Sequence, residues 1–338
     1  MIHMEQNREP EIEKRRNRGG TVDIGTKEEG AIVETININE RLIIVKEKSI
    51  YEFVLADTLD PKRERPNLPS SVHTKILDRG SDDPVVARIF LTAKALFDTN
   101  YYPDSINVRK ALLHTLEVVK ELRAMEKEIE GYNSEHDKAC NAYEERKGVP
   151  AYMLPSIPDM LTRCKTIFQK ADHACQYIMD VIRLFYPEMS EKNYYTDFEK
   201  FVTMKYGEND HFSKFLQQVV PFIMEIRRAP NCFEHRKVEL ILTNFEIQDK
   251  GSLLMPTFEM NFDGSIIPRQ DLHTYLSNVM KGLMNSFENM LPFLASKHIK
   301  PMGVIAPQIR EVPEEKRRRK MVRFGIWLPF ANEGFYAQ

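Results

Sequence analysis

"PDMLTRCKTIFQKADHACQYIMDVIRLFY", residues 158–186, is the stretch that decides the fold of this chain. Its apolar side chains recur at steps of three and four residues, which places them on one side of an α-helix about seven turns long. His173 lies away from the centre of that side, which indicates a partly solvated helix residue and not a ligand. The pattern predicts one buried face, formed by Met160, Leu161, Cys164, Ile167, Phe168, Ala171, Ala174, Cys175, Ile178, Val181, Ile182 and Phe185.

Helical periodicity continues on the C-terminal side of this stretch. Residues 210–228 and 270–295 both repeat the spacing of an amphipathic helix. Between them, two runs of alternating apolar and polar residues predict a β-hairpin over residues 238–262. We therefore expect a mainly α protein, with a helical bundle over residues 151–300 that carries the inserted hairpin.

The N-terminal part of the chain differs in composition and pattern. Residues 31–56 are rich in β-branched side chains, which favours one or two strands followed by a helix or a further strand. Asp83-Pro84 is typical of a helix start, and residues 123–147 are charged all round, with a helix break expected at Gly131. Residues 31–150 are thus expected to form a small α+β region that ends in a long, charged, exposed helix.

Both ends of the chain are polar or basic. Residues 1–30 hold the basic cluster Lys14, Arg15, Arg16 and Arg18 and few large apolar residues, which predicts a disordered basic arm; a phosphate or partner contact is the alternative. Residues 301–338 form a C-terminal extension, in which a charge run precedes "MVRFGIWLPF", a candidate closing strand with Trp327.

The composition excludes several classes of protein. The 338 residues carry a formal net charge of −2, which argues against a protein that coats nucleic acid through a global basic field. The four cysteines form no CxxC pair, so we expect reduced thiols in a cytoplasmic protein and no zinc site. A secretory signal, a membrane-spanning run, a P-loop, a Rossmann glycine pattern, HExxH and GxSxG are all missing from the sequence. No metal and no cofactor are expected.

"EIRRAPNCFEHRK", residues 225–237, combines residue types that suit metal-free cleavage of RNA. A histidine can take or give a proton at neutral pH, and an arginine can hold the charge that grows on phosphate oxygens. We assign catalytic roles to Arg228, Asn231 and His235, and RNA contacts to Arg227, Arg236 and Lys237. Pro230 is expected to end or kink the preceding helix near Arg228. The alternative is a polar cap with surface ion pairs, which spacing alone favours.

The helices predicted over residues 158–186 and 210–228, together with this Arg/Asn/His cluster, resemble the HEPN superfamily. The resemblance implies a compact helical bundle and a metal-independent endoribonuclease that works as a dimer, often in bacterial toxin–antitoxin or antiviral defence systems. On this alignment Arg228 is the phosphate clamp and His235 the acid–base residue, with six residues between them. A second alignment, anchored on Asn231 and His235, puts Pro230 at the arginine position and implies a member that has lost activity.

Two other functions remain open. The bundle could serve as a non-catalytic interaction protein, either as a homodimer or with a protein partner bound at residues 123–147 and 316–320. It could also sense a nucleotide or small ligand held between helices. No membrane association is expected.

Overall fold

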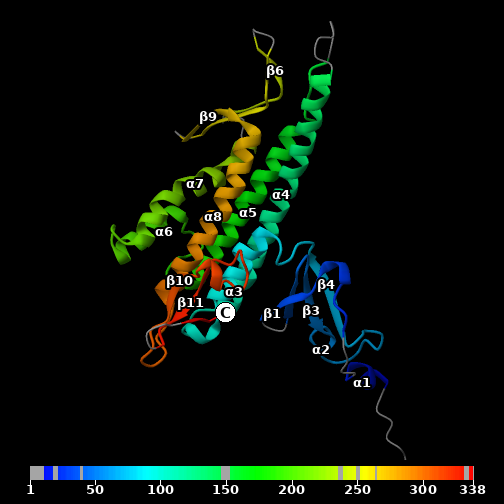
Figure 1. The fold of residues 1–338 in the computed structure, drawn as a ribbon, viewed down its shortest axis with the longest axis vertical. Coiled ribbons are helices and arrows are strands. Elements are labelled where there is room, and N and C mark those ends of the chain that lie inside the picture. Colours follow the sequence, from blue (N-terminus) through cyan, green and yellow to red (C-terminus); the bar gives the residue numbers. More distant parts are fainter. Residues whose placement is uncertain are drawn as a thin grey trace, which may run out of the picture. The chain divides into compact units, whose positions relative to one another are not determined.

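The computed structural model describes residues 11–17, 22–38, 41–145, 153–234, 239–248, 252–262, 265–330 and 335–337. The chain divides into two compact units, residues 1–87 and residues 88–338. Helices dominate the described residues, so the expected mainly α class is confirmed (Figure 1).

The first unit is built around an antiparallel sheet with the strand order β1-β2-β3-β4 (Figure 1). Its β-branched residues favour strands because branched side chains pack well on a pleated surface. The sequence predicted strands in this region but not the last one, β4. The elements are α1 (Glu11–Arg16), β1 (Ile32–Ile38), β2 (Arg41–Lys46), β3 (Ile50–Leu55), α2 (Ala56–Leu59) and β4 (Ser71–Leu77).

The N-terminal arm is part of this unit, and the prediction of a disordered segment over residues 1–30 is wrong where the structure describes it. The side chain of Arg16 is fully buried and donates to the carboxylate of Asp60 at 2.7 Å. The carboxylate of Glu29 accepts a hydrogen bond from the Tyr51 hydroxyl at 2.9 Å. These charged residues are ordered because each finds a partner of opposite charge or a polar group inside the unit.

The second unit is a helical bundle. Helices α4, α5 and α8 pack along one another, α7 packs against α5 and α8, and α6 packs against α7 (Figure 1). Among the described residues, no helix combines the length and the apolar content that a membrane span requires. The helices are α3 (Thr92–Leu96), α4 (Val108–Glu145), α5 (Met160–Phe185), α6 (Tyr195–Tyr206), α7 (His211–Glu234) and α8 (Leu272–His298).

Helix α5 confirms the helix that was predicted over residues 158–186. Every residue assigned to its buried face is buried except Leu161, which is 58% exposed near the start of the helix. His173 projects from the helix with half of its side chain exposed and lies 3.6 Å from Glu121. The predicted solvated role of this histidine is confirmed.

Helix α4 differs from the prediction in two ways. It runs unbroken through Gly131, and it is not charged all round, because Met125, Ile129 and Tyr132 are buried. These apolar residues lie on the side that packs along α5. Since α4 belongs with the helices that follow it, the compact unit begins at residue 88, whereas the sequence placed a boundary near residue 150.

Helix α7 also continues where a break was expected. It contains both Pro221 and Pro230, although each lacks the N–H that would bond to the preceding turn. A buried stripe holds the helix against its neighbours and outweighs the lost hydrogen bonds. The stripe consists of Phe212, Leu216, Val220, Ile223, Ile226, Ala229 and Cys232.

The predicted hairpin is confirmed, and it is larger than expected. Strand β5 (Glu239–Thr243) pairs with β8 (Thr257–Phe262), and β8 pairs with a third strand, β9 (Ser265–Asp271). A short outer pair, β6 (Glu246–Ile247) and β7 (Leu253–Leu254), extends the hairpin. The amide of Asn244 exchanges two hydrogen bonds of 3.1 Å with the backbone of Ile157, which fixes the hairpin beside the start of α5.

The C-terminal extension forms a small antiparallel sheet in the order β10-β11-β12. Its strands are β10 (Gln308–Glu311), β11 (Phe324–Leu328) and β12 (Phe335–Ala337), so the closing strand predicted around Trp327 is confirmed. β11 lies against α3, and β10 lies against α8. The sheet is therefore packed on the bundle.

Candidate active site at the end of α7

The last turns of α7 carry the candidate catalytic residues. Because the helix is unbroken to Glu234, Arg228 and Asn231 lie about one turn apart on the same side. That side faces away from the core: Asn231 is exposed and Arg228 is half-buried, whereas Ala229 and Cys232 are buried. Three of the six predicted site residues, His235, Arg236 and Lys237, lie outside the described residues.

Arg227 is engaged in a contact between helices. Its Nε donates to Asp172 of α5 at 3.0 Å, and its guanidinium lies 5.5 Å from the ring centroid of Tyr194 at the start of α6. Asp172 also accepts a hydrogen bond from Gln176 at 2.7 Å. Arg227 therefore joins three helices.

Aromatic packing holds the end of α7 in place. The ring of Phe233 lies 5.6 Å from that of Phe168 on α5, which in turn stacks on Phe258 of β8 at the same distance. The thiol of Cys232 donates to the carbonyl of Arg228 at 3.4 Å, and burial raises the pKa of that thiol. The helix end is thus fixed by its inner side, which leaves its outer side for polar residues.

A histidine at the end of α8 is not suited to proton transfer at neutral pH. Burial lowers the pKa of His298 to about 4, and its ring packs against Phe185 and Tyr186. At pH 7 it is therefore neutral and enclosed by aromatic side chains.

A second cluster of polar residues was missed at the sequence level. The rings of His136 on α4 and His273 on α8 lie 5.4 Å apart, and the sulfur of Cys140 lies 3.9 Å from both ring nitrogens of His136. The only signal in the sequence is the spacing of four residues between His136 and Cys140, which is common in helices. Burial raises the pKa of Cys140, so its thiol is poorly suited to act as a nucleophile.

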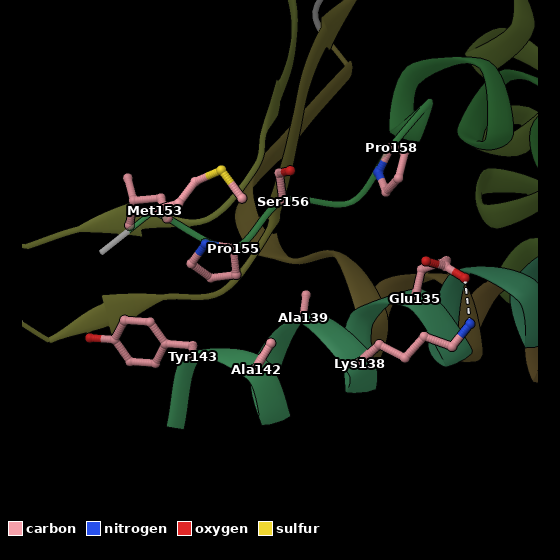
Figure 2. A pocket seen from close by; sticks show the side chains of 10 residues that line it. Glu135, Lys138, Ala139, Ala142, Tyr143, Met153, Pro155, Ser156 and Pro158 are labelled. Atoms are coloured by element: carbon pink, nitrogen blue, oxygen red, sulfur yellow. Dashed lines mark hydrogen bonds and ion pairs between the residues drawn. The ribbon is translucent and has the colours of Figure 1, made fainter. Parts of the chain in front are cut away.

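A cavity of about 300 Å³ lies beside the end of α4. Figure 2 shows Ala139, Ala142 and Tyr143 of the helix facing Met153 and Pro155 of the segment that leads to α5. Its charged residues, Glu135 and Lys138, pair with each other at 2.8 Å. The described lining of the cavity is mainly apolar, and its lysine and glutamate neutralise each other.

No cluster of histidine, cysteine, aspartate or glutamate in the described part of the chain is arranged to hold a metal ion. Comparison of the chain with protein-family models, with curated proteins and with solved structures finds no match. The resemblance to the HEPN superfamily therefore rests on the residues of α5, α7 and the Arg/Asn/His cluster alone.

Proposed function

We propose that this chain is a HEPN-like, RNA-directed protein that cleaves RNA without a metal, as part of a bacterial defence or toxin system. The observation that supports the proposal most is the unbroken course of α7 through Pro230. It puts Arg228 and Asn231 on one side of the helix, and His235 is the next residue in the sequence after Glu234. Spacings of three and four residues, from Arg228 to Asn231 and from Asn231 to His235, favour one shared side.

The proposed reaction is an internal transesterification of RNA. The imidazole of His235 removes the proton from a 2′-hydroxyl, and the 2′-oxygen attacks the adjacent phosphorus. The bond from phosphorus to the 5′-oxygen breaks, and that oxygen receives a proton from an imidazolium. The products are a 2′,3′-cyclic phosphate and a 5′-hydroxyl end.

Arg228 and Asn231 have supporting roles in this reaction. The guanidinium of Arg228 holds the negative charge that builds on the phosphate oxygens in the transition state. The amide of Asn231 positions the ribose or the phosphate. Arg236 and Lys237 add positive charge for the RNA backbone, and a second copy of the chain supplies the other half of the cleft, as the resemblance implies.

The reaction class is tested with purified protein and labelled RNA in the presence of EDTA. We expect cleavage that leaves 2′,3′-cyclic phosphate ends and that stops at a position carrying a 2′-deoxyribose. Arg228→Ala should slow cleavage by about 100-fold, the cost of removing one transition-state donor. The control is Arg109→Ala, which removes an exposed arginine at the start of α4. Cleavage of the 2′-deoxy substrate, or cleavage lost in EDTA, would contradict the proposed mechanism.

A second function is favoured by two other observations. Arg227 is paired with Asp172, and Pro230 is a helical residue directly before Asn231, where the second alignment requires an arginine. On that reading the chain is a non-catalytic interaction protein that uses the same bundle to bind a copy of itself or a protein partner.

Pro230→Arg separates the two functions. If the chain is an inactive member, the variant supplies the missing clamp, and cleavage appears only in the variant. If Arg228 is the clamp, the wild type cleaves RNA and the variant is no faster.

A further inference from the structure

The outer face of the C-terminal sheet carries a group of residues that the proposed active site does not use. In the pairing of β10 with β11, Gln308 lies opposite Trp327 and Arg310 lies opposite Gly325. The other face of the same pair carries the buried residue Ile326 toward the bundle. Because side chains alternate across a strand, Gln308, Arg310 and Trp327 share the face that points away from the core.

Arg310 and Trp327 form a fixed stack on this face. The centre of the guanidinium lies 3.7 Å from the centroid of the indole ring. Gln308 Oε1 accepts from Arg310 Nε at 3.0 Å and from Nη2 at 2.6 Å. Gly325, directly opposite Arg310, has no side chain to occupy the space that the arginine crosses. The guanidinium of this exposed arginine is thus held over the ring by Gln308.

The chain between β10 and β11 is rich in positive charge. From Gln308 to Arg323 the sequence has seven lysines and arginines and three glutamates, in a chain whose net charge is −2. Glu311 pairs with Arg317 and with Arg323, both at 3.2 Å, and these pairs hold the loop in shape. The exposed cations of the loop are Lys316, Arg318 and Lys320.

We infer that this face, defined by Gln308, Arg310 and Trp327, docks single-stranded RNA together with the basic loop 316–320 that follows β10 in the sequence; the inference rests on the proposed function and names its substrate class. A base can stack on the outer side of the guanidinium, while the lysines and arginines bind the phosphates. Duplex RNA keeps its bases paired and offers no base for stacking. An acidic peptide matches the positive charge of the loop but has no base that could stack on the guanidinium of Arg310.

Binding is measured with the full-length His235→Ala chain, which keeps the RNA intact, and a labelled oligouridine of about 12 nucleotides. Arg310→Ala should weaken binding by about tenfold, as expected for the loss of one stacked base. Arg310→Lys keeps the charge, loses the planar group, and should weaken binding nearly as much. Arg318→Gln with Lys320→Gln should reduce the slope of log affinity against log salt by about 1 to 1.5. Arg109→Ala is the matched control and should bind as the parent does.

Three results would overturn the inference. They are no binding of oligouridine by the parent, binding that Arg310→Ala and Arg310→Lys leave unchanged, and binding of polyglutamate that depends on Arg310 to the same extent. A separate cleavage assay keeps the two proposals apart. If RNA binding depends on Arg310 but no RNA is cleaved, the docking face is supported and the ribonuclease activity is ruled out. If RNA is cleaved at a rate that does not depend on Arg310, the ribonuclease activity is supported and the docking face is ruled out.

Discussion

A single carboxylate organises the N-terminal unit. Glu29 accepts hydrogen bonds from the Tyr51 hydroxyl and from the backbone N–H of Thr26, both at 2.9 Å, and it pairs with Lys75 and with the buried Lys46. The hydrogen bond from Lys75 is the main cause that lowers the pKa of Glu29 to about 2. The ionised form of Glu29 is therefore part of the folded structure.

The stability of this unit should depend on pH through Glu29. The folded pKa lies below the ordinary value of 4.5, so the stabilisation is complete above about pH 5 and is lost as the pH falls toward 2. Hydrogen exchange of the backbone amides of β2 and β3, followed from pH 7 to pH 3, measures it. In Glu29→Gln the same amides should be less protected at pH 7 and should change less with pH. Equal pH profiles for the two proteins would show that Glu29 is not the titrating group.

Among single residues, spacing along the sequence indicates neighbours on one helix but not contacts between helices. The pattern of Arg228, Asn231 and His235 could be read from spacing, but the partner of Arg227 could not. Asp172 lies 55 positions away on another helix, and only the packing of α5 against α7 brings the two together. The stack of Arg310 on Trp327 was likewise hidden, because it depends on the strand pairing that puts Gly325 opposite the arginine.

Two glycines in helices show how the neighbouring helix decides the effect of one methyl group. At Gly131 in α4, a Cβ would lie 2.5 Å from the Nη1 atom of Arg163, the end of a flexible side chain. At Gly282 in α8, a Cβ would lie 2.4 Å from the ring of Phe222. The arginine can move aside at little cost, whereas an aromatic ring in a helix contact cannot.

We expect Gly131→Ala to raise the free energy of unfolding by about 0.5 to 1 kcal/mol, because alanine favours the helix. Gly282→Ala should lower it by about 1 kcal/mol or more, because the added methyl group forces the ring to shift. Chemical denaturation of both variants beside the wild type measures the two effects. Changes of the same sign would contradict the contacts described for one of these helices.

Pro230 is a weak point inside α7. Alanine at this position restores an N–H that can bond to the carbonyl of Ile226 and removes the clash of the proline ring. Pro230→Ala should therefore stabilise the protein by about 1 to 3 kcal/mol. The melting temperature measures this directly, and a lower value would mean that the proline fits a local geometry that an ordinary helix does not share.

At the scale of elements, periodicity predicted α5 and α8 well and failed where packing overrides local preference. Gly131 was expected to break α4 and Pro230 to end or kink α7, yet the buried stripes of these helices carry each helix past the residue. Strand β9 was missed because it contains Pro268, a residue that argues against a strand. In the sequence of α4, the many charged residues made the apolar stripe that packs along α5 hard to recognise.

At the scale of the whole molecule, the proposed reaction implies a dimer, because one copy supplies only one set of Arg228, Asn231 and His235. Light scattering after size exclusion should give twice the 39.5 kDa mass of the chain, and the mass should stay the same in His235→Ala. If the protein cleaves RNA as a monomer, the cleft is not shared between two copies, but the proposed roles of the three residues still hold.

The catalytic role of His235 is tested by comparing the rates at which three proteins cleave RNA in EDTA. They are the wild type, His235→Ala, and His173→Ala, which removes a half-exposed histidine from α5. We predict that the wild type and His173→Ala cleave at the same rate and that His235→Ala is slower by about 100-fold or more, the usual contribution of a general acid–base group. Cleavage by His235→Ala at the rate of the wild type would show that His235 is not the acid–base residue.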